Sequence, residues 1–101
     1  MFYIYIIYSY AGNKYYVGYS TDPLRRVIEH NTNPFNTYTS KYKPWVLKSY
    51  FQCSASEKEA IRIERFIKKQ KSRTLIEQLC DPNFIPSGFL AQLVRVPDIR
   101  D

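Results

Sequence analysis

The chain of 101 residues has the length of one compact domain and is too short for two. Hydrophobic residues make up 45% of it and charged residues 24%, a balance that excludes wholesale disorder. No apolar run is long enough to cross a bilayer, and the cysteines, Cys53 and Cys80, form no CxxC motif. We therefore expect a cytoplasmic protein with free thiols and no membrane association.

The formal net charge of +6 favours a polyanionic partner, and its distribution is uneven. Between Lys41 and Arg73 lie ten lysines and arginines against three acidic residues, a local net charge of +7. A lysine-rich, solvated helix face would give the same count. The charge alone therefore does not separate such a face from a nucleic-acid-binding surface.

The first predicted element is a β-hairpin. Residues 2–8 and 15–20 are rich in aromatic and β-branched side chains, with the turn signal Gly12-Asn13 between them. An even-numbered tight loop pairs odd positions of the first strand with even positions of the second. We therefore expect Tyr5 and Tyr16 to share one face of the hairpin.

A helix is predicted next, in the stretch TDPLRRVIEHN. Thr21 or Asp22 would be the N-cap, and Pro23 lies in the first turn. Arg26 and His30, four residues apart, stand together on one side of this helix. The apolar stripe on another side consists of Leu24, Val27 and Ile28.

The middle of the chain predicts a loop, a third strand and a second helix. Residues 31–44 are polar and interrupted by prolines, and residues 45–51 (WVLKSYF) have the pattern of a strand. The capping box Ser56-x-x-Glu59 then precedes a helical run. Glu64 lies one turn from its apolar residues Ala60 and Ile67, which holds a carboxylate at the edge of the core.

The C-terminal part is less regular. Thr74-x-x-Glu77 predicts a further short helix over TLIEQLC, and the tail from Asp81 has three prolines. Within that tail, the pattern LAQLVRV allows three alternatives: it packs as an extra strand, it packs as a helix, or it mediates self-association. We expect a domain over residues 1–80 and an extension over 81–101 of unknown role. The order strand–strand–helix–strand–helix–helix predicts an α+β fold, a small three-stranded antiparallel sheet flanked by helices.

Two short motifs give this pattern a family likeness. Tyr3-Ile4-Tyr5 and Tyr16-Val17-Gly18, ten residues apart and followed by Arg26, His30 and Glu64, resemble the GIY-YIG nuclease superfamily. The resemblance is to its small standalone members, related to the nuclease domain of the bacterial excision-repair protein UvrC. It covers about residues 2–79, including KYKPW at 41–45 and AIRIERFIKK at 60–69.

The resemblance implies a DNA endonuclease in which one divalent cation, Mg²⁺ or Mn²⁺, assists hydrolysis of a phosphodiester. It implies that Glu64 holds the metal and that a tyrosine acts in or near the proton-abstracting role. The expected catalytic residues are Tyr5, Tyr16, Arg26, His30 and Glu64. The residues expected to contact DNA are Gly18, Tyr19, Arg25, Lys41, Lys43 and Lys68. A domain this small has no room for an extended recognition module, so we expect selection of DNA structure, as in repair or recombination.

The residue chemistry is compatible with these roles. A phenol with a reference pKa near 10 needs nearby cations to act as a base at pH 7, and Arg26 and a metal would supply them. We favour Tyr16 as the base, with His30 as the alternative acceptor or proton relay. Arg26 offers a fork of donors to a phosphoryl oxygen, and Glu64 is a hard ligand suited to Mg²⁺. Gly18, which has no side chain, would let either backbone or a phosphate approach closely at the strand end.

The sequence also departs from the family pattern. Tyr3 stands where the first motif has glycine, and Tyr19 where UvrC-like domains often have lysine. Many members have a later asparagine near the metal; the only asparagine after Glu64 is Asn83, and its flanks match poorly.

Each residue also has an ordinary structural interpretation. Strand tyrosines commonly pack, Arg26 and His30 would suit a solvated helix face, and Glu64 would pair with Lys68 at i+4. Two other functions therefore stand beside the nuclease: a non-catalytic nucleic-acid-binding module with the nuclease fold, and an interaction domain that uses its aromatic surface. The joint occurrence of five residues in the family order favours the nuclease. The sequence does not indicate an oligomeric state.

Overall fold

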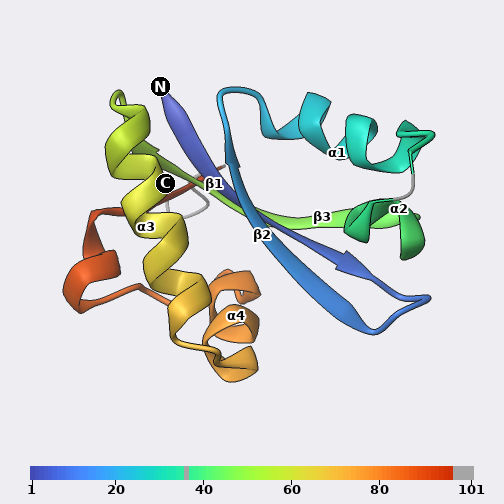
Figure 1. Cartoon of the computed structure of the whole chain (residues 1–101). Helices are drawn as coiled ribbons and strands as arrows, with labels where there is room; N and C mark the ends of the chain where they lie inside the picture. Colours follow the sequence, from blue (N-terminus) through green and yellow to red (C-terminus); the bar gives the residue numbers. More distant parts are fainter. Residues whose placement is uncertain (36, 97–101) are drawn as a thin grey trace.

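The computed structural model describes residues 1–35 and 37–96, and its framework is a four-stranded antiparallel sheet (Figure 1). The strands are β1 (Phe2–Ser9), β2 (Lys14–Ser20), β3 (Trp45–Ser54) and β4 (Val94–Val96), in the order β2-β1-β3-β4. The α+β fold class is confirmed, but the prediction of three strands is wrong. The added strand has only three residues and lies in LAQLVRV, the stretch for which an extra strand was one of the open alternatives.

The hairpin forms as predicted. Ser9 pairs with Lys14, which leaves residues 10–13 as an even-numbered loop. Asn13 takes a left-handed conformation there, with φ of 51°, which asparagine tolerates better than most residues. Tyr5 pairs with Gly18, and Tyr16 pairs with the next odd position of β1, so Tyr5 and Tyr16 share a face.

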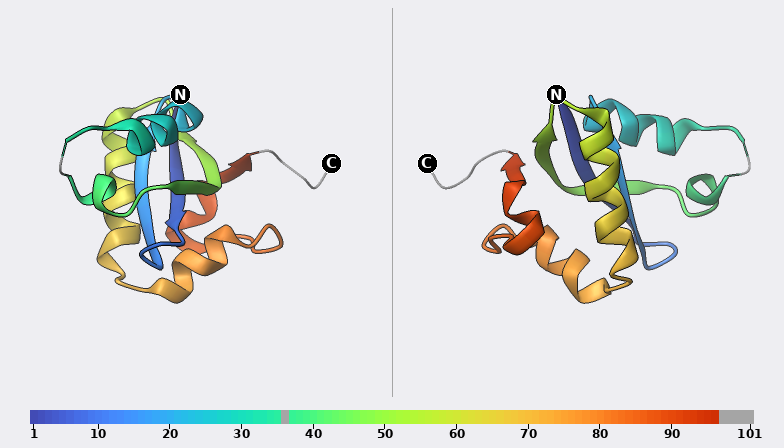
Figure 2. Two further views of the ribbon diagram at one scale, coloured as in Figure 1. Left: turned by 90° about the vertical axis from the view of Figure 1, so that its right-hand side faces the viewer. Right: turned by 60° about the vertical axis from the view of Figure 1, so that its left-hand side comes forward.

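Helices cover both faces of the sheet (Figures 1 and 2). On one side lie α1 (Pro23–Thr32) and the short α2 (Tyr38–Lys41), a helical turn inside the segment predicted as a loop. On the other side lie α3 (Glu57–Lys69) and α4 (Arg73–Cys80). Asp22 and Ser56 are the N-caps of α1 and α3, but α4 is capped by Ser72 and not by Thr74. Each helix is too short or too polar to cross a membrane, within the residues described.

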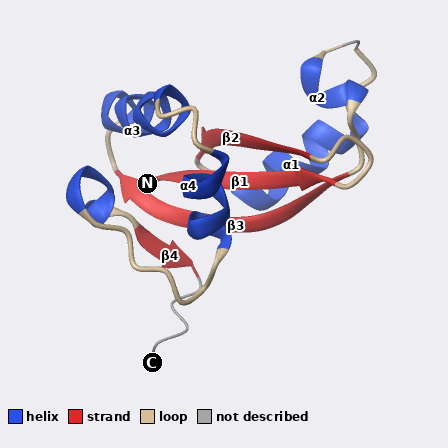
Figure 3. Cartoon of the chain, turned by 90° about the horizontal axis from the view of Figure 1, so that it is seen from below, coloured by secondary structure: helices blue, strands red, loops and turns tan. Residues whose placement is uncertain are grey.

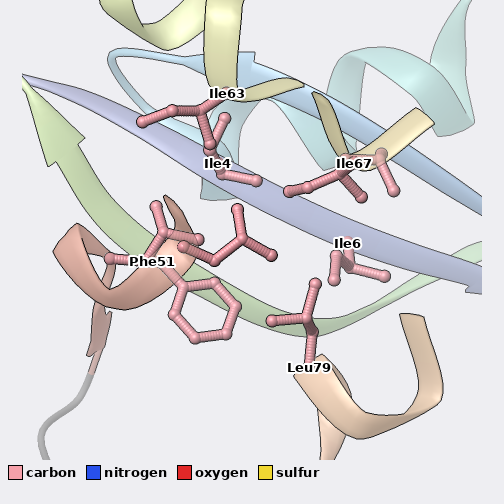
Figure 4. Close-up of a cluster of buried hydrophobic side chains, with 9 residues drawn as sticks. Ile4, Ile6, Phe51, Ile63, Ile67 and Leu79 are labelled. Atoms are coloured by element: carbon pink, nitrogen blue, oxygen red, sulfur yellow. The ribbon is translucent and has the colours of Figure 1, made fainter. Parts of the chain in front are cut away.

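The larger core lies between the sheet and the α3–α4 side (Figure 4). Ile4 and Ile6 of β1 pack there against Ile63 and Ile67 of α3. The C-terminal extension contributes too, through Leu90 of the 3₁₀ helix η1 (Gly88–Gln92) and through Leu93, which precedes β4. The remaining buried residues of this larger core are Val17, Phe51 and Leu79. Residues 97–101 of the predicted extension lie outside the described residues.

Helix α1 packs on the sheet with its polar side inward. Leu24 and Ile28 of the predicted apolar stripe are 59% and 62% exposed, whereas His30 is 3% exposed. Of this stripe only Val27 is partly buried, and it packs against the cluster of Tyr5 and Trp45. Two hydrogen bonds fix the orientation: Trp45 N–H donates to the Asn31 side chain at 2.6 Å, and the Asn31 amide donates to the Trp45 carbonyl at 3.0 Å.

Candidate active site

The site is centred on Tyr5, which is buried between β2 and α1. Its ring passes over Gly18, where a Cβ would collide with the phenol oxygen and ring carbons. Its hydroxyl lies 2.8 Å from Nε2 of His30, within hydrogen-bond distance. Glycine at position 18 thus gives the Tyr5 phenol the room to reach α1.

Burial determines the protonation of this pair. It raises the pKa of Tyr5 well above its usual value, with Tyr16 and Glu64 acting in the same direction and Arg26 opposing them. Burial, followed by the positive charge of Arg26, lowers the pKa of His30 to about 4. Both side chains are therefore neutral at pH 7, and a single hydrogen bond joins them.

Tyr16 connects this pair to the solvent side of the site. Its ring centroid lies 5.2 Å from that of His30 and 6.4 Å from that of Tyr5. Among residues 1–35 and 37–96 its hydroxyl has no hydrogen-bond partner, in contrast to that of Tyr5. The ammonium of Lys68, from α3, lies 5.2 Å from the Tyr16 ring centroid. Residues from both faces of the sheet therefore meet around Tyr16, at the β2 edge.

Arg26 lies beside Tyr5 and is partly exposed. The positive charge of its guanidinium opposes the rise in the Tyr5 pKa. Its Nη1 also lies 3.1 Å from Oε1 of Glu29, a residue outside the predicted site. The spacing of Glu29, at i+3 from Arg26 and i+4 from Arg25, is the signal that could have identified it. Glu29 therefore orients and partly neutralises Arg26.

Glu64 supplies the carboxylate of the site. Its side chain is 16% exposed and its oxygen pairs with Lys68 at 3.2 Å, the i,i+4 pair that the structural interpretation anticipated. Its charge still reaches Tyr5, where it raises the pKa. No group of three His, Cys, Asp or Glu side chains suited to a metal occurs among the described residues. One carboxylate nevertheless fits Mg²⁺ or Mn²⁺, because Mg²⁺ keeps several water ligands and takes phosphate oxygens.

The structure thus brings five predicted catalytic residues and Lys68 to one edge of the sheet. Tyr19 is different: it lies on the α3 side, where its hydroxyl donates to Glu57 at 3.1 Å, which raises the Tyr19 pKa. Asn83 follows α4, where its backbone N–H donates to Asp81.

The remaining predicted DNA contacts lie on the α1–α2 side. Arg25 is exposed, 3.7 Å from Glu29. Lys41 is exposed at the end of α2, and Lys43 donates to the Asn33 carbonyl at 3.4 Å. Two aromatic neighbours of Tyr16 were not predicted: the ring centroid of Tyr38 lies 6.3 Å from that of Tyr16, and that of Trp45 lies 6.2 Å from it. An aromatic residue in sequence carries no signal that separates such a role from ordinary packing.

Comparisons with known proteins bear on this arrangement. The GIY-YIG catalytic domain family matches residues 1–77. A UPF0213 protein of Halobacterium salinarum is 40% identical over 79 residues, covering 78% of this chain and 99% of that protein. A UPF0213 protein of Streptococcus pneumoniae is 38% identical over 69 residues, 68% of each chain. The solution NMR structure of a UPF0213 protein from Bacillus halodurans has 32% identity and a TM-score of 0.46, covering 85% of this chain and 89% of that one.

The family match spans both tyrosine motifs and extends through α3, so it includes every residue gathered around Tyr16. The similar proteins are themselves small, and the resemblance to small standalone members of the superfamily is confirmed. The chain belongs to the GIY-YIG family.

Proposed function

We propose that this protein is a metal-dependent endonuclease that hydrolyses DNA phosphodiester bonds. The observation that carries the proposal is the orientation of α1, which buries neutral His30 against Tyr5 and leaves Leu24 and Ile28 in solvent. Burying an imidazole in place of two aliphatic side chains sacrifices stability, and such exceptions to folding rules concentrate at functional sites. Membership of a nuclease family supports the same reading.

In this proposal Tyr16 is the proton acceptor for the attacking water. Its hydroxyl is free of hydrogen bonds to the described residues, whereas the Tyr5 hydroxyl is engaged with His30. The raised pKa of Tyr5 disfavours it as a base, so the Tyr5–His30 pair orients the site and relays a proton. Arg26 exchanges its contact with Glu29 for a non-bridging phosphoryl oxygen.

Glu64 would hold Mg²⁺ or Mn²⁺, which when bound supplies charge neutralisation at the phosphoryl oxygens. The ammonium of Lys68 now neutralises this carboxylate and would turn to the substrate phosphate instead. DNA binding is also proposed to involve Arg25, Lys41 and Lys43. Gly18 would support it indirectly, because it leaves room for the Tyr5 ring. For Tyr19, which lies on the other face, the proposal is limited to a distal contact.

The proposed enzyme selects DNA by its structure, and the proposed role is in DNA repair or recombination. The proposed location of the protein is the cytoplasm. The small sheet presents a cationic and aromatic surface suited to backbone and unpaired bases.

A cleavage assay with a matched control tests the nuclease proposal. Purified protein would be incubated with Mg²⁺ or Mn²⁺ and a panel of duplex, nicked, branched and single-stranded DNA. Glu64→Gln, which keeps the shape and removes the charge, should abolish cleavage and retain binding. Glu59→Gln is the control, since Glu59 lies on the same helix and also pairs with a basic neighbour, Arg62, at 2.9 Å. Absence of cleavage of every substrate by the wild-type protein would refute the proposal.

The Glu64–Lys68 ion pair favours one second candidate, a non-catalytic nucleic-acid-binding module. A carboxylate that only balances a neighbouring lysine has no need of a metal. That alternative predicts nucleic-acid binding that weakens steeply with salt and no cleavage of any substrate. Glu64→Gln should then leave the behaviour of the protein unchanged.

A further inference from the structure

A groove lies at the hairpin end of β2, beside the proposed catalytic site. Its volume is about 260 Å³, below the roughly 300–1,000 Å³ of pockets that enclose small-molecule ligands. Its lining includes Lys14 and Tyr15 of the hairpin, Tyr38 of α2, and Lys68 and Lys71 at the end of α3. Figure 3 shows β2 as the outermost strand at this edge, with α3 beside it.

The groove is cationic. Four basic residues line it and no carboxylate does, within the part of the chain described. Arg73 has a structural role, because its guanidinium donates to the backbone and side-chain oxygens of Asn13 at 3.0 and 2.7 Å. Lys14 lies over the Tyr42 ring at 5.3 Å. The ammonium of Lys71 has no ion-pair or hydrogen-bond partner among residues 1–35 and 37–96.

Lys71 also occupies a conformation that does not suit lysine. It follows the end of α3 with φ of 49°, in the left-handed region, and its N–H donates to the Lys68 carbonyl. Helices commonly end on glycine at such a position because a Cβ is unfavourable there. A lysine that keeps its side chain in this conformation, over a cationic groove, indicates a use for its charge.

The groove is continuous with the catalytic site through two shared residues. Lys68 lines the groove and contacts both Glu64 and the Tyr16 ring. Tyr38 is 50% exposed and has its ring centroid 6.3 Å from that of Tyr16. A chain of phosphates leaving the site toward the hairpin would therefore pass Lys68 and reach Lys71, and the half-exposed ring of Tyr38 would be available to a base.

We propose that this groove binds the backbone of an unpaired DNA strand immediately next to the phosphodiester that is cleaved. Lys71 and Lys14 contact its phosphates, and Tyr38 stacks on an unpaired base, the combination that single-strand binding sites use. The inference rests on the proposed function for its position along the substrate. It goes beyond that function in assigning a second binding site to the junction of α3 and α4.

The test measures binding in the Glu64→Gln background, so it does not depend on cleavage. Fluorescence anisotropy would compare a flush-ended duplex with two tailed versions of it. One version carries a single-stranded oligothymidylate tail on one strand, and the other carries the tail on the opposite strand. Lys71→Gly should weaken binding of a tailed duplex about two- to fivefold and leave the flush duplex unchanged. The slope of log K against log salt should fall by about 0.7. Because glycine suits this backbone, the variant should melt no lower than its parent.

Two further variants complete the design. Lys58→Ala removes a charge from an exposed position at the opposite end of α3 and should bind as the parent does. Lys71→Arg keeps the charge and should retain tailed-duplex binding. The proposal is overturned if Lys71→Gly binds the tailed duplex normally, if it weakens the flush duplex equally, or if Lys58→Ala has the same effect. None of these outcomes bears on whether the wild-type protein cleaves DNA, which the Glu64 assay decides.

Discussion

The Tyr5 hydroxyl and Nε2 of His30 lie 2.8 Å apart, at the point where β1 and α1 meet. The pair is shielded from solvent, and the pKa of His30 is lowered to about 4. Because the chain has a single histidine, this contact gives the protein a pH dependence that can be assigned to one residue.

Stability should rise with pH between about 4 and 6.5. In that window the unfolded chain, with an ordinary histidine pKa near 6.5, binds more protons than the folded protein. The stability contributed by neutral His30 is therefore complete above pH 6.5 and is lost as the pH falls toward 4. Urea unfolding at pH 7 and pH 5 should differ by about 2 kcal/mol. The His30→Gln protein, the control, should show little difference, and an equal pH dependence in both proteins would contradict the assignment.

Removing either phenol oxygen should separate structure from catalysis. Tyr5→Phe leaves Nε2 of buried His30 without its partner and should cost about 1–3 kcal/mol of unfolding free energy. Tyr16→Phe should change stability by less than about 0.5 kcal/mol, because the described residues give its hydroxyl no partner. If Tyr16 is the base, the same variant should reduce the cleavage rate about 100-fold or more. Normal cleavage by Tyr16→Phe would assign the base to another group.

Gly18→Ala should destabilise the protein by about 1–3 kcal/mol, because its methyl group would overlap the Tyr5 ring. Tyr5 is 1% exposed, so its ring is enclosed by neighbouring side chains and backbone. The measurement is urea unfolding of Gly18→Ala in two backgrounds, wild type and Tyr5→Leu. The shorter leucine removes the overlap, so the penalty should be smaller there; equal penalties would show that the two residues are not coupled.

Replacing Leu24 and Ile28 by glutamine should each change the unfolding free energy by no more than about 0.5 kcal/mol, since both side chains are largely in solvent. Ile63→Ala, in the larger core, is the reference and should cost about 2–5 kcal/mol. Thermal or urea unfolding measures all three. A large loss for Leu24 or Ile28 would mean that α1 is rotated relative to the orientation described.

Local patterns identified most of the elements, and they failed where a long-range contact decides. The hairpin, α1, β3 and α3 follow from alternation, caps and helical periodicity. For α1 the same periodicity offers two faces, and the face turned to the sheet is selected by the bonds between Asn31 and Trp45. Ser72 caps α4 where Thr74 was expected, because two hydroxyl residues lie two positions apart and both suit the motif.

The candidate site shows the same division. The shared face of Tyr5 and Tyr16 follows from the hairpin register alone. Lys68 and Tyr38 join them only because α3 and α2 reach the β2 edge from opposite sides, and no spacing in the sequence encodes that meeting. Tyr19 was expected beside the site, yet its odd position on β2 places it on the other face.

The strand β4 has a consequence for the solubility of shortened chains. It pairs with residues 50–52 of β3, and Leu90 and Leu93 before it close the larger core. A chain ended at residue 80 would uncover Phe51 and leave the ten-residue β3 with an open edge. Open strand edges beside exposed apolar surface recruit further copies of the same chain. We therefore expect the C-terminal segment to reduce aggregation through β3, because it covers the edge of that strand.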